Sequence, residues 1–323
     1  MDIPLITPLL GFVYKIGVRI DRSLTRSIRL PKPVISVGNI AAGGRGKTPF
    51  VNFIAQGLKA RGFEPVVLTR GYGRRDRNLR VWLLPGSKKN FSPDICGDEA
   101  LEIFFRSRIP VLVGPKRFQN ALFFLRGRLA TEKMVFILDD GFQHWDLHRD
   151  FDLVLLRESD YKASLLPLGF LREEPASLGR ASLILEDLKD FQKKTFLKVS
   201  LPKDKDPLIL TTRVPDPHYH RYFKEQCRNP FFLELRDHAE FSEIVRHLQR
   251  FETDVPVVVG AKEATKIFSY GELQSFFEEG HAKKEIAPQK TYQFYFADFE
   301  LWLLNEEMFW SRILSALPQS LSK

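Results

Sequence analysis

A glycine-rich segment at residues 38–50, GNIAAGGRGKTPF, joins an apolar, β-rich run to a helical pattern. Glycine lets the backbone curl tightly enough for successive N–H groups to point inward, and the N-terminus of the following helix adds positive potential. The run before it is Val34–Val37, and the helical pattern begins at Phe50. This context predicts a phosphate-binding loop (P-loop). The alternative is a glycine-rich turn that contains Gly-Lys-Thr by chance.

The loop backbone and two side chains are the predicted nucleotide-binding groups. Lys47 is expected to reach the β- and γ-phosphates of ATP, and the Thr48 hydroxyl is expected to hold Mg²⁺. The strict pattern has a glycine five residues before Gly46, where this sequence has Ala41. The predicted ATP-binding residues are Gly43, Gly44, Arg45, Gly46, Lys47, Thr48 and Pro49.

Short apolar runs alternate with helical patterns along most of the chain. The first group of runs is Val34–Val37, Val66–Leu68, Val111–Val113, Met134–Leu138 and Leu153–Leu156. They predict an α/β fold of the P-loop NTPase type, with a mostly parallel sheet, helices on both faces and sites at the carboxyl ends of its strands. A lysine-rich stretch at 189–206 is interpreted as a join. The runs Leu208–Leu210, Phe231–Leu235 and Val255–Val259 then predict a second, smaller α/β domain. The expected domains are 30–205 and 206–323.

The charge and cysteine content of the chain limit its partners and its compartment. A net charge of +9 and a pI of about 9.4 favour an anionic partner. No zinc-ligand spacing or RNA-binding signature accompanies this charge, so nucleic acid is not expected. Cys96 and Cys227 are too few for a disulfide framework, which indicates a reducing cytosol. His218, His220 and Cys227 are irregularly spaced, and surface residues explain them better than a metal cluster.

Residues 1–29 predict a basic amphipathic helix. Five basic residues at spacings of three and four fall on one arc: Lys15, Arg19, Arg22, Arg26 and Arg29. The remaining face is apolar: Leu9, Phe12, Val13, Ile16, Ile20, Leu24 and Ile28. No uncharged apolar run reaches about 18 residues, so a helix lying in the inner leaflet near anionic headgroups is expected rather than a spanning one. The alternative is a helix that packs its apolar face on the domain.

A second motif follows the apolar run Met134–Leu138, which ends in the acid pair Asp139 and Asp140. A P-loop threonine needs a nearby acid to complete Mg²⁺ coordination, as in a Walker B motif. Without the P-loop, a helix cap or turn would be the better explanation of the acid pair.

Four further segments place groups that suit an anionic substrate near strand ends. Arg70 and Tyr72 belong to a basic loop, and Arg117 follows another apolar run. Asp98 either caps a helix or accepts a hydroxyl proton. The segment 141–150 holds Gln143 and His144 in reach of a phosphate or sugar. Solvated loop charges and a structural histidine are the alternatives.

Together these motifs resemble the tetraacyldisaccharide 4′-kinase family of the lipid A pathway. The matching segments are SVGN at 36–39, GGRGKTP at 43–49, RGY at 70–72, GDE at 97–99, DDGFQH at 139–144, LHRD at 147–150 and LPLGFLRE at 166–173. The resemblance is strong to about residue 185 and weaker beyond it. An alanine at the position of Ala41 is usual in that family.

The resemblance implies a peripheral or monotopic enzyme on the cytoplasmic face of the inner membrane. It would transfer the γ-phosphoryl of ATP to the 4′-hydroxyl of a tetraacylated glucosamine disaccharide 1-phosphate, which forms lipid IVA. Anionic inner-membrane lipid is an implied partner, and nothing points to an obligate protein partner.

The resemblance also implies roles for single residues. Lys47, Asp98 and His238 are implied as catalytic, with Asp98 as the base and His238 as its partner. The implied metal-site residues are Thr48, Asp139, Asp140, Gln143 and Glu173. The implied substrate-binding residues are Arg70, Tyr72, Arg117, Gln143, His144 and Arg172. The sequence departs from the family pattern at four places, namely Phe170, the segment 213–217, Arg236-Asp237-His238 and Lys262-Glu263.

Two other functions remain compatible with the residues themselves. One is a P-loop kinase for a small soluble metabolite, which leaves the amphipathic N-terminus without a task. The other is a nucleotide-switched membrane or metal-delivery protein. Such a protein usually has a guanine-specifying Asn/Thr-Lys-x-Asp motif or clustered metal ligands, and neither is convincing here.

Overall fold

The computed structural model describes residues 14–18, 20, 22–87, 89–127, 131–212, 217–236 and 239–318. The chain forms two compact units, each built from separate stretches. The first unit contains Met1–Arg70, Ile109–Gln192 and Leu303–Lys323, and the second contains Gly71–Arg108 and Lys193–Trp302. The contiguous domains 30–205 and 206–323 stay a prediction, and the compact units do not follow that division.

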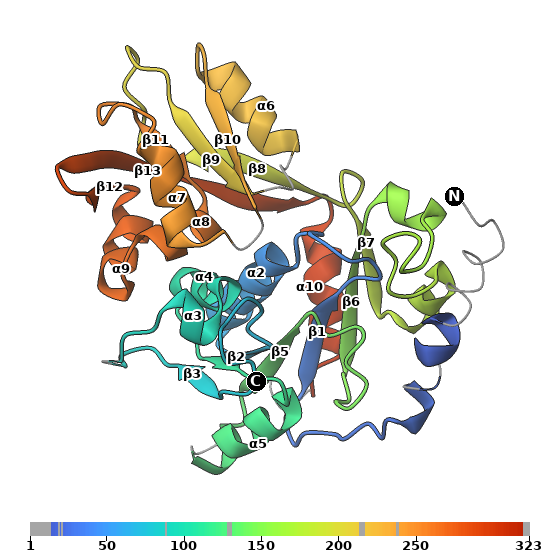
Figure 1. The fold of residues 1–323 in the computed structure, drawn as a ribbon. Helices are drawn as coiled ribbons and strands as arrows, with labels where there is room; N and C mark the ends of the chain where they lie inside the picture. The colour runs from blue at the N-terminus through green and yellow to red at the C-terminus, as the bar shows by residue number, and fades with distance from the viewer. Residues whose placement is uncertain are drawn as a thin grey trace. The chain divides into compact units, whose positions relative to one another are not determined.

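The first unit is built on parallel strands (Figure 1). Its elements are β1 (Val34–Gly38), α2 (Lys47–Ala60), β2 (Glu64–Thr69), β4 (Val111–Val113), α5 (Arg117–Gly127), β5 (Met134–Asp139), β6 (Phe151–Leu156), β7 (Leu183–Glu186), α10 (Glu306–Ser315) and the 3₁₀ turns η1 (Glu158–Lys162) and η2 (Pro175–Arg180). The strands run in the order β4-β2-β5-β1-β6-β7, and each of these neighbouring pairs is parallel. All five predicted runs of this part are strands, and the prediction of a mostly parallel α/β fold is confirmed.

Burial explains why these segments form strands and helices. Every residue of β1, β5 and β6 is buried, as expected for central parallel strands covered on both faces. The helix α2 buries Phe50, Ile54 and Leu58 at a spacing of four. Its Phe53 stacks on Trp310 of α10 with ring centroids 5.6 Å apart. A Cβ at Gly57 would lie 2.1 Å from the Trp310 ring, so this glycine allows α10 to approach α2.

The strand register brings the ends of three neighbouring strands together. Val37 of β1 pairs with Asp139 of β5, and Leu68 of β2 pairs with Leu138. Thr69 therefore lies beside Asp139. Because parallel strands share a carboxyl edge, the loops that follow β1, β2 and β5 lie at one edge of the sheet.

The second unit is a separate α/β arrangement. Its elements are β3 (Val81–Leu83), α3 (Pro93–Cys96), α4 (Asp98–Ser107), β8 (Phe191–Leu197, from residue 193), β9 (Leu208–Thr212), α6 (Pro217–Gln226), β10 (Phe231–Leu235), α7 (Phe241–Leu248), β11 (Val257–Val259), α8 (Ala261–Ile267), α9 (Tyr270–Glu279), β12 (His281–Ala287) and β13 (Lys290–Leu303). The sheet order is β10-β9-β11-β13-β12, with β8 paired to β13. Among the strand pairs of this sheet whose register is described, β12–β13 is antiparallel and the other three are parallel.

The lysine-rich stretch expected as a join contains the strand β8. Phe191 and Thr195 of this strand are buried, while Gln192 and Lys194 between them are exposed. This alternation is that of a half-buried strand, and Gln192, Lys194 and Phe196 occupy its exposed side. The boundary between the two compact units, after Gln192, lies inside this stretch, whereas the strand β8 is not among the predicted runs.

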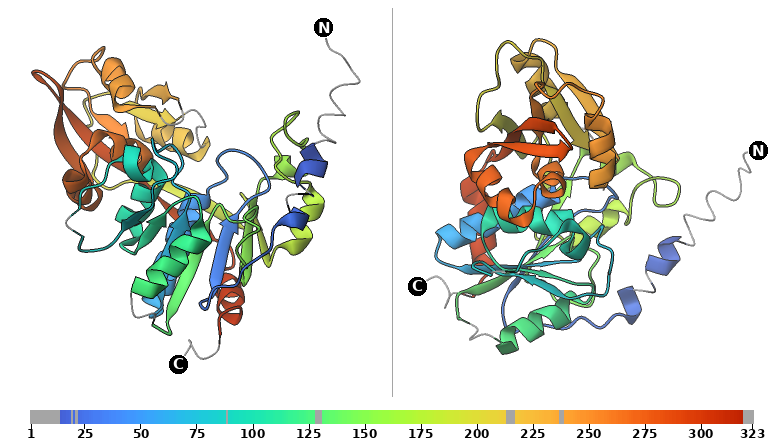
Figure 2. Two further views of the ribbon diagram at one scale, coloured as in Figure 1. Left: turned by 60° about the horizontal axis from the view of Figure 1, so that its bottom comes forward. Right: turned by 60° about the vertical axis from the view of Figure 1, so that its left-hand side comes forward.

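Helical residues precede β1 at 14–18, 20 and 22–24 (Figure 2). They contact the first unit through polar groups, because Tyr14 Oη donates to the Arg172 carbonyl at 3.2 Å and Lys15 Nζ lies 2.6 Å from Glu174 Oε1. A stripe of apolar side chains at a spacing of four is exposed instead: Ile16, Ile20, Leu24 and Ile28. We call these four residues the exposed stripe. Within the described part of the chain, this arrangement disfavours the alternative in which the helix packs its apolar face on the domain.

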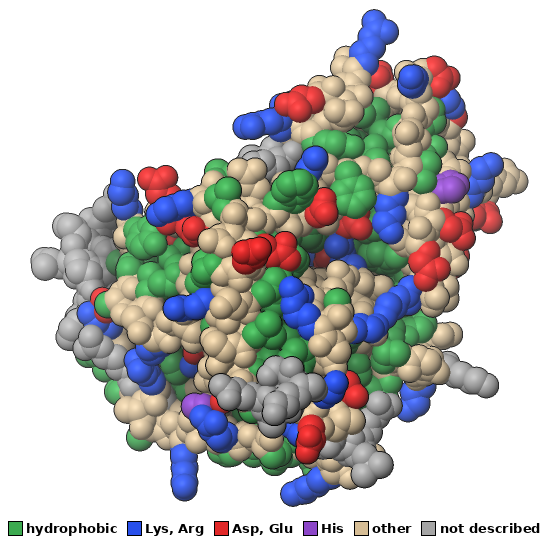
Figure 3. All heavy atoms as spheres, turned by 180° about the vertical axis from the view of Figure 1, so that it is seen from behind, with side chains coloured by type: hydrophobic (Ala, Val, Ile, Leu, Met, Phe, Trp, Pro, Cys, Tyr) green, Lys and Arg blue, Asp and Glu red, His purple; other side chains and the backbone are tan. Residues whose placement is uncertain are grey.

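Two further features bear on a membrane or anionic partner, namely the length of the described helices and the distribution of charge on the surface. Among the described residues, none of the helices combines the length and apolar character needed to cross a bilayer. On the face drawn in Figure 3, Lys and Arg side chains are intermingled with acidic and hydrophobic ones.

Candidate active site

The loop after β1 has the backbone of an anion-binding turn. Gly43 has φ of 92°, and Gly46, the N-cap of α2, has φ of 77°, which are left-handed values that favour glycine. A Cβ built on Gly43 or Gly44 would meet nothing within 4 Å, so the loop borders open space. Thr48 and Pro49 follow in the first turn of α2. The free N–H groups of a helix start suit a phosphate at this place.

The segment 170–173 fixes the other half of the loop. Ala42 N donates to the Phe170 carbonyl at 2.6 Å, and Arg172 N donates to the Ile40 carbonyl at 2.7 Å. Ala41 is completely buried and packs in a cluster with Phe142 and Leu171, among others. This packing explains an alanine where the strict pattern has glycine, because its methyl group fills a core position.

Lys47 and the acid pair meet at the carboxyl edge of the sheet. Lys47 Nζ lies 3.5 Å from Asp140 Oδ1 and donates to Asn39 Oδ1 at 3.3 Å. Asp139 is buried, and its Oδ2 accepts a hydrogen bond of 2.9 Å from Thr69 Oγ1. The predicted P-loop lysine and the predicted acids are therefore neighbours.

The two acids have opposite electrostatic surroundings. Burial, followed by the charge of Asp140, raises the pKa of Asp139. Burial also acts to raise the pKa of Asp140, but Lys47 and Arg172 outweigh it and lower this pKa to about 2. Arg172 contacts both Asp140 carboxylate oxygens, at 3.1 and 2.9 Å. Asp140 is thus held ionised between two cations.

Arg117 is a buried structural support of the acid pair. Its Nη1 donates to the backbone carbonyls of Asp139 and Asp140 at 2.8 and 3.2 Å. Asp140 has φ of 50°, a left-handed value that is strained for an aspartate, and Arg117 fixes this turn. Burial, with Arg70 nearby, lowers the pKa of Arg117 to about 10, so its guanidinium stays charged at neutral pH. The guanidinium reaches the backbone of the acid turn in this structure.

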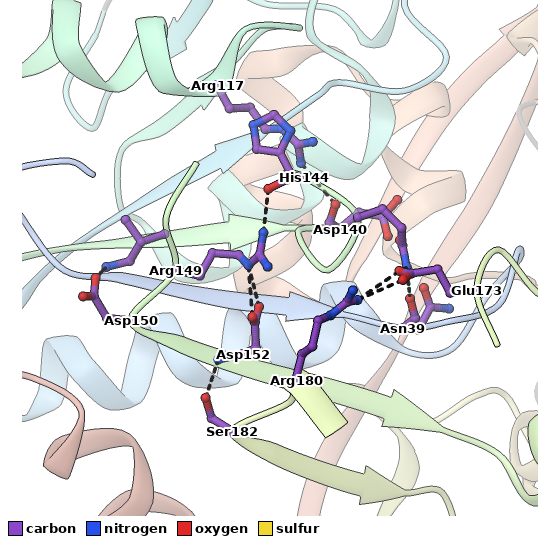
Figure 4. Close-up of polar contacts among 12 residues, drawn as sticks. Asn39, Arg117, Asp140, His144, Arg149, Asp150, Asp152, Glu173, Arg180 and Ser182 are labelled. Atoms are coloured by element: carbon purple, nitrogen blue, oxygen red, sulfur yellow. Dashed lines mark hydrogen bonds and ion pairs between the residues drawn. The ribbon is translucent and has the colours of Figure 1, made fainter. Parts of the chain in front are cut away.

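Glu173 lies between Asn39 and Arg180 in a polar network beside the P-loop (Figure 4). Gln143 belongs to the same network. Gln143 Nε2 donates to the Asn39 carbonyl at 2.8 Å and to Glu173 Oε1 at 2.9 Å. Arg180 Nη2 donates to Glu173 Oε2 at 2.9 Å. Within the described residues, Gln143 Oε1 and Asn39 Nδ2 are buried and have no hydrogen-bond partner. Both an oxygen and an N–H group are therefore available here to a bound molecule.

His144 is buried and oriented by its neighbours. Its Nε2 lies 2.9 Å from Asp146 Oδ1, and its carbonyl accepts a bond of 2.6 Å from Arg149 Nη1. Burial lowers the pKa of His144, so the imidazole is neutral at pH 7. A neutral, buried imidazole fits a positioning or hydrogen-bonding role better than a charged contact to phosphate.

The remaining predicted residues are distributed over both units. Arg70 ends the first unit directly after β2 and is exposed, and Tyr72 is an exposed residue of the second unit. Asp98 is the first residue of α4 in the second unit, and it is buried. Its Oδ1 accepts a bond of 3.0 Å from Glu99 N. His238 and its neighbour Asp237 lie outside the described residues.

Several groups at the site were not assigned a role from sequence. Thr69 and Asn39 are two of them, and they bond to Asp139 and Lys47. Arg45 was expected to bind ATP, and its side chain pairs with the buried carboxylate of Asp160 at 2.7 Å. Thr69 could have been found from the sequence, because it directly follows an apolar run that is predicted to be a strand of the same sheet as the run before Asp139. Nothing in the sequence pointed to Asp160, which lies 115 residues after Arg45.

Comparison with known proteins places the chain in a family. Residues 4–228 match the family model described as tetraacyldisaccharide-1-P 4′-kinase. The chain belongs to this kinase family. The resemblance drawn from its motifs is thereby confirmed.

Relatives of this kinase family match the chain over different lengths. The tetraacyldisaccharide 4′-kinase of Koribacter versatilis is 41% identical over 175 residues, which is 51% of this chain and 51% of that relative. The chain thus matches about half the length of that protein. The tetraacyldisaccharide 4′-kinase of Shewanella halifaxensis is 34% identical over 281 residues, which is 80% of this chain and 82% of that relative.

A solved structure supports the fold. It is described as the apo form of LpxK from Aquifex aeolicus in complex with ATP. It aligns with a TM-score of 0.73 at 23% sequence identity, over 95% of this chain and 97% of that one. The α/β fold inferred for this member of the kinase family is therefore confirmed.

Proposed function

We propose that this chain transfers the γ-phosphoryl group of ATP to the 4′-hydroxyl of tetraacyldisaccharide 1-phosphate and so forms lipid IVA. One observation supports this proposal above the others. The P-loop lysine, Lys47, and the ionised Asp140 lie 3.5 Å apart at the sheet edge that the register of β1 and β5 creates. Phosphoryl transfer from a nucleoside triphosphate needs a lysine for the phosphates and an acid for Mg²⁺, and these two groups are neighbours here.

Phosphoryl transfer depends on positioning and charge neutralisation, since charge spreads over the phosphoryl oxygens. In our proposal the loop N–H groups and Lys47 bind the β- and γ-phosphates. Two arginines fix the turn at Asp139 and Asp140. Arg172 contacts the Asp140 carboxylate, and Arg117 donates to the backbone carbonyls. The phosphates then enter a site whose cations are already fixed, which lowers the cost of reorganisation.

The residues present fit a Mg²⁺ ion that shares its ligands with ATP. Mg²⁺ prefers oxygen ligands and is commonly held by one or two carboxylates together with substrate phosphates. Asp139, Asp140 and the Thr48 hydroxyl are the proposed ligands, with Gln143 Oε1 and Glu173 close by. Among the described residues, no group of three His, Cys, Asp or Glu side chains is placed to hold a metal by itself. When bound, Mg²⁺ would neutralise phosphate charge.

For the acceptor we propose that Asp98 takes the proton of the 4′-hydroxyl. Asp98 is buried at the start of a helix, where the helix dipole favours a carboxylate. Arg70, Tyr72 and His144 are proposed to bind the disaccharide, while Arg117 and Arg172 act through the acid pair. His238 as a partner of Asp98 stays a prediction.

We further propose that the chain binds the cytoplasmic face of the inner membrane through the exposed stripe. Ile16, Ile20 and Leu24, at a spacing of four, form one exposed helix face, and Ile28 continues the row beyond the end of the helix. Lys15 and Arg22 contact Glu174 and Trp145 of the same unit. An exposed apolar helix face suits the boundary between headgroups and acyl chains of a bilayer, where the lipid substrate also lies.

The decisive experiment follows ³²P from γ-labelled ATP into purified tetraacyldisaccharide 1-phosphate in detergent micelles with Mg²⁺. Wild type is compared with Lys47→Ala and with Lys59→Ala, a lysine near the other end of the same helix. Label in the lipid with wild type and Lys59→Ala, but not with Lys47→Ala, supports the proposal. ATP hydrolysis without labelled lipid would favour a soluble metabolite or a nucleotide switch instead.

The membrane proposal has its own test, flotation with phosphatidylcholine vesicles that contain or lack phosphatidylglycerol. The variant Ile16→Ser, Ile20→Ser, Leu24→Ser should lose binding. The matched control replaces Leu188 and Phe231, which are exposed apolar residues elsewhere, by serine. Equal loss in both variants would contradict a specific role of the exposed stripe.

A further inference from the structure

A buried cluster of charged side chains joins α4 to α8 within the second unit. The acids are Asp98 and Glu102 on α4 and Glu263 on α8, with side chains that are almost fully buried. The cations are Lys262 and Lys266 on α8, whose side chains are 20% and 9% exposed. Burying ionised groups is costly unless they are paired, so the pairing in this cluster has a functional or structural reason.

Of the two lysines on α8, Lys266 lies closer to Asp98. Its Nζ lies 3.5 Å from Asp98 Oδ2, whereas Lys262 Nζ lies 3.9 Å from the same oxygen and 3.9 Å from Glu99 Oε1. The two lysines are four residues apart on α8 and so share one face of that helix. Lys262 is divided between two carboxylates, while the contact of Lys266 is to Asp98.

The other acidic groups that face Asp98 compete weakly for these cations at neutral pH. Burial raises the pKa of Glu102 to about 7, and Arg106 Nε lies 3.4 Å from its carboxylate. Burial also raises the pKa of Glu263 and brings the pKa of the Cys96 thiol to about 12. Glu102 and Glu263 therefore hold protons more readily than exposed acids do, and the thiol is neutral.

We propose that Lys266 is a positioning residue for Asp98, which it holds ionised and fixed at the first turn of α4, with Lys262 as a weaker second partner. The inference rests on the proposed function, in which Asp98 is the base. In that step the proton leaves the 4′-hydroxyl for the Asp98 carboxylate. The freed oxygen bonds to the γ-phosphorus, and the bond from that phosphorus to the bridging oxygen of ADP breaks.

The test is the dependence of kcat on pH for lipid phosphorylation. Lys266→Met removes the cation, so Asp98 loses its proton only at higher pH. We expect the acid limb of the profile to move up by about one to three pH units, with KM for ATP unchanged. Lys266→Arg should return the acid limb of the profile to its wild-type position. Lys284→Met is the matched control, because Lys284 pairs with Glu272 in the same unit without contact to Asp98.

A double-mutant comparison separates positioning from structural support. In an Asp98→Asn background, Lys266→Met should cause no further loss of kcat, because its partner is already neutral. A loss of the same factor in both backgrounds, or an unshifted acid limb, would overturn the inference. Thermal unfolding identifies variants that do not fold, and if Lys266→Met is one, Lys266→Gln must show the same limb shift.

The failures of the two proposals are distinguishable. A wild-type enzyme that does not label the lipid overturns the proposed function, and the inference with it. An active wild type with an unimpaired Asp98→Asn variant overturns Asp98 as the base. An active wild type, an impaired Asp98→Asn variant and an unshifted Lys266→Met profile overturn the role of Lys266 alone.

Discussion

Replacing Arg45 by methionine is expected to destabilise the first unit by about 3–5 kcal/mol. Arg45 and Asp160 are 9% and 0% exposed in their side chains. Arg45 Nε lies 3.2 and 3.1 Å from the two carboxylate oxygens, and Nη2 lies 2.7 Å from Oδ1. With methionine at 45, Asp160 keeps a bond of 3.0 Å from Arg157 N but loses its cation. Because water cannot reach this carboxylate, the loss is the cost of an unpaired buried charge.

Urea unfolding of wild type, Arg45→Met, Asp160→Asn and the double variant measures this effect. The double variant leaves no buried charge, so it should cost less than the sum of the single variants by at least about 2 kcal/mol. At about 2–4 °C for each kcal/mol, Arg45→Met should also lower the melting temperature by about 10 °C. A single-variant cost below about 1 kcal/mol, or simple additivity, would refute the argument from burial.

Two further substitutions test other features of the structure. Glu102→Gln tests the buried charge on α4, whose pKa burial raises from 4.5 to about 7. The protonated form is favoured by folding, so this stabilisation is complete below about pH 4.5 and is lost as the pH rises through about 7. Wild type should therefore lose about 3 kcal/mol between pH 4.5 and 8 that the glutamine variant keeps, and a constant difference in unfolding free energy would contradict this. Gly38→Ala should cost about 1–3 kcal/mol, because its Cβ would lie 2.6 Å from Phe142 Cβ and 2.8 Å from Phe142 N. Gly44→Ala has open space and should unfold like wild type in the same urea titration.

The central part of the fold was predictable because its signals are local and repeated. Buried parallel strands are continuous apolar runs, and five such runs in the first unit and three in the second are strands. The carboxyl ends of such strands lie at one edge, so the P-loop and the acid pair were expected near one another. Glycines with left-handed backbone angles at 43 and 46 agree with the predicted loop.

The rest depended on contacts that sequence spacing does not encode. The strand β8 was hidden by its polar residues, Gln192, Lys193 and Lys194, and α10 returns to the first unit after the second is complete. Asp160 and Lys266 lie more than a hundred residues from the partners they pair with. A buried ion pair of this kind is set by the three-dimensional neighbours of each charge, which no periodicity in the chain reports.

Arg172 links the N-terminal helix to the phosphate-binding loop. Its carbonyl accepts from Tyr14, its N–H donates to Ile40 of the loop, and its side chain contacts Asp140. The N-terminal segment therefore helps to hold the phosphate-binding loop in its conformation. Removing residues 1–29 would remove the Tyr14 contact as well as the exposed stripe. Slower catalysis by such a truncated enzyme could then come from a changed loop or from lost membrane binding. Serine substitutions confined to the exposed stripe leave Tyr14 in place and separate attachment to lipid from the shape of the loop.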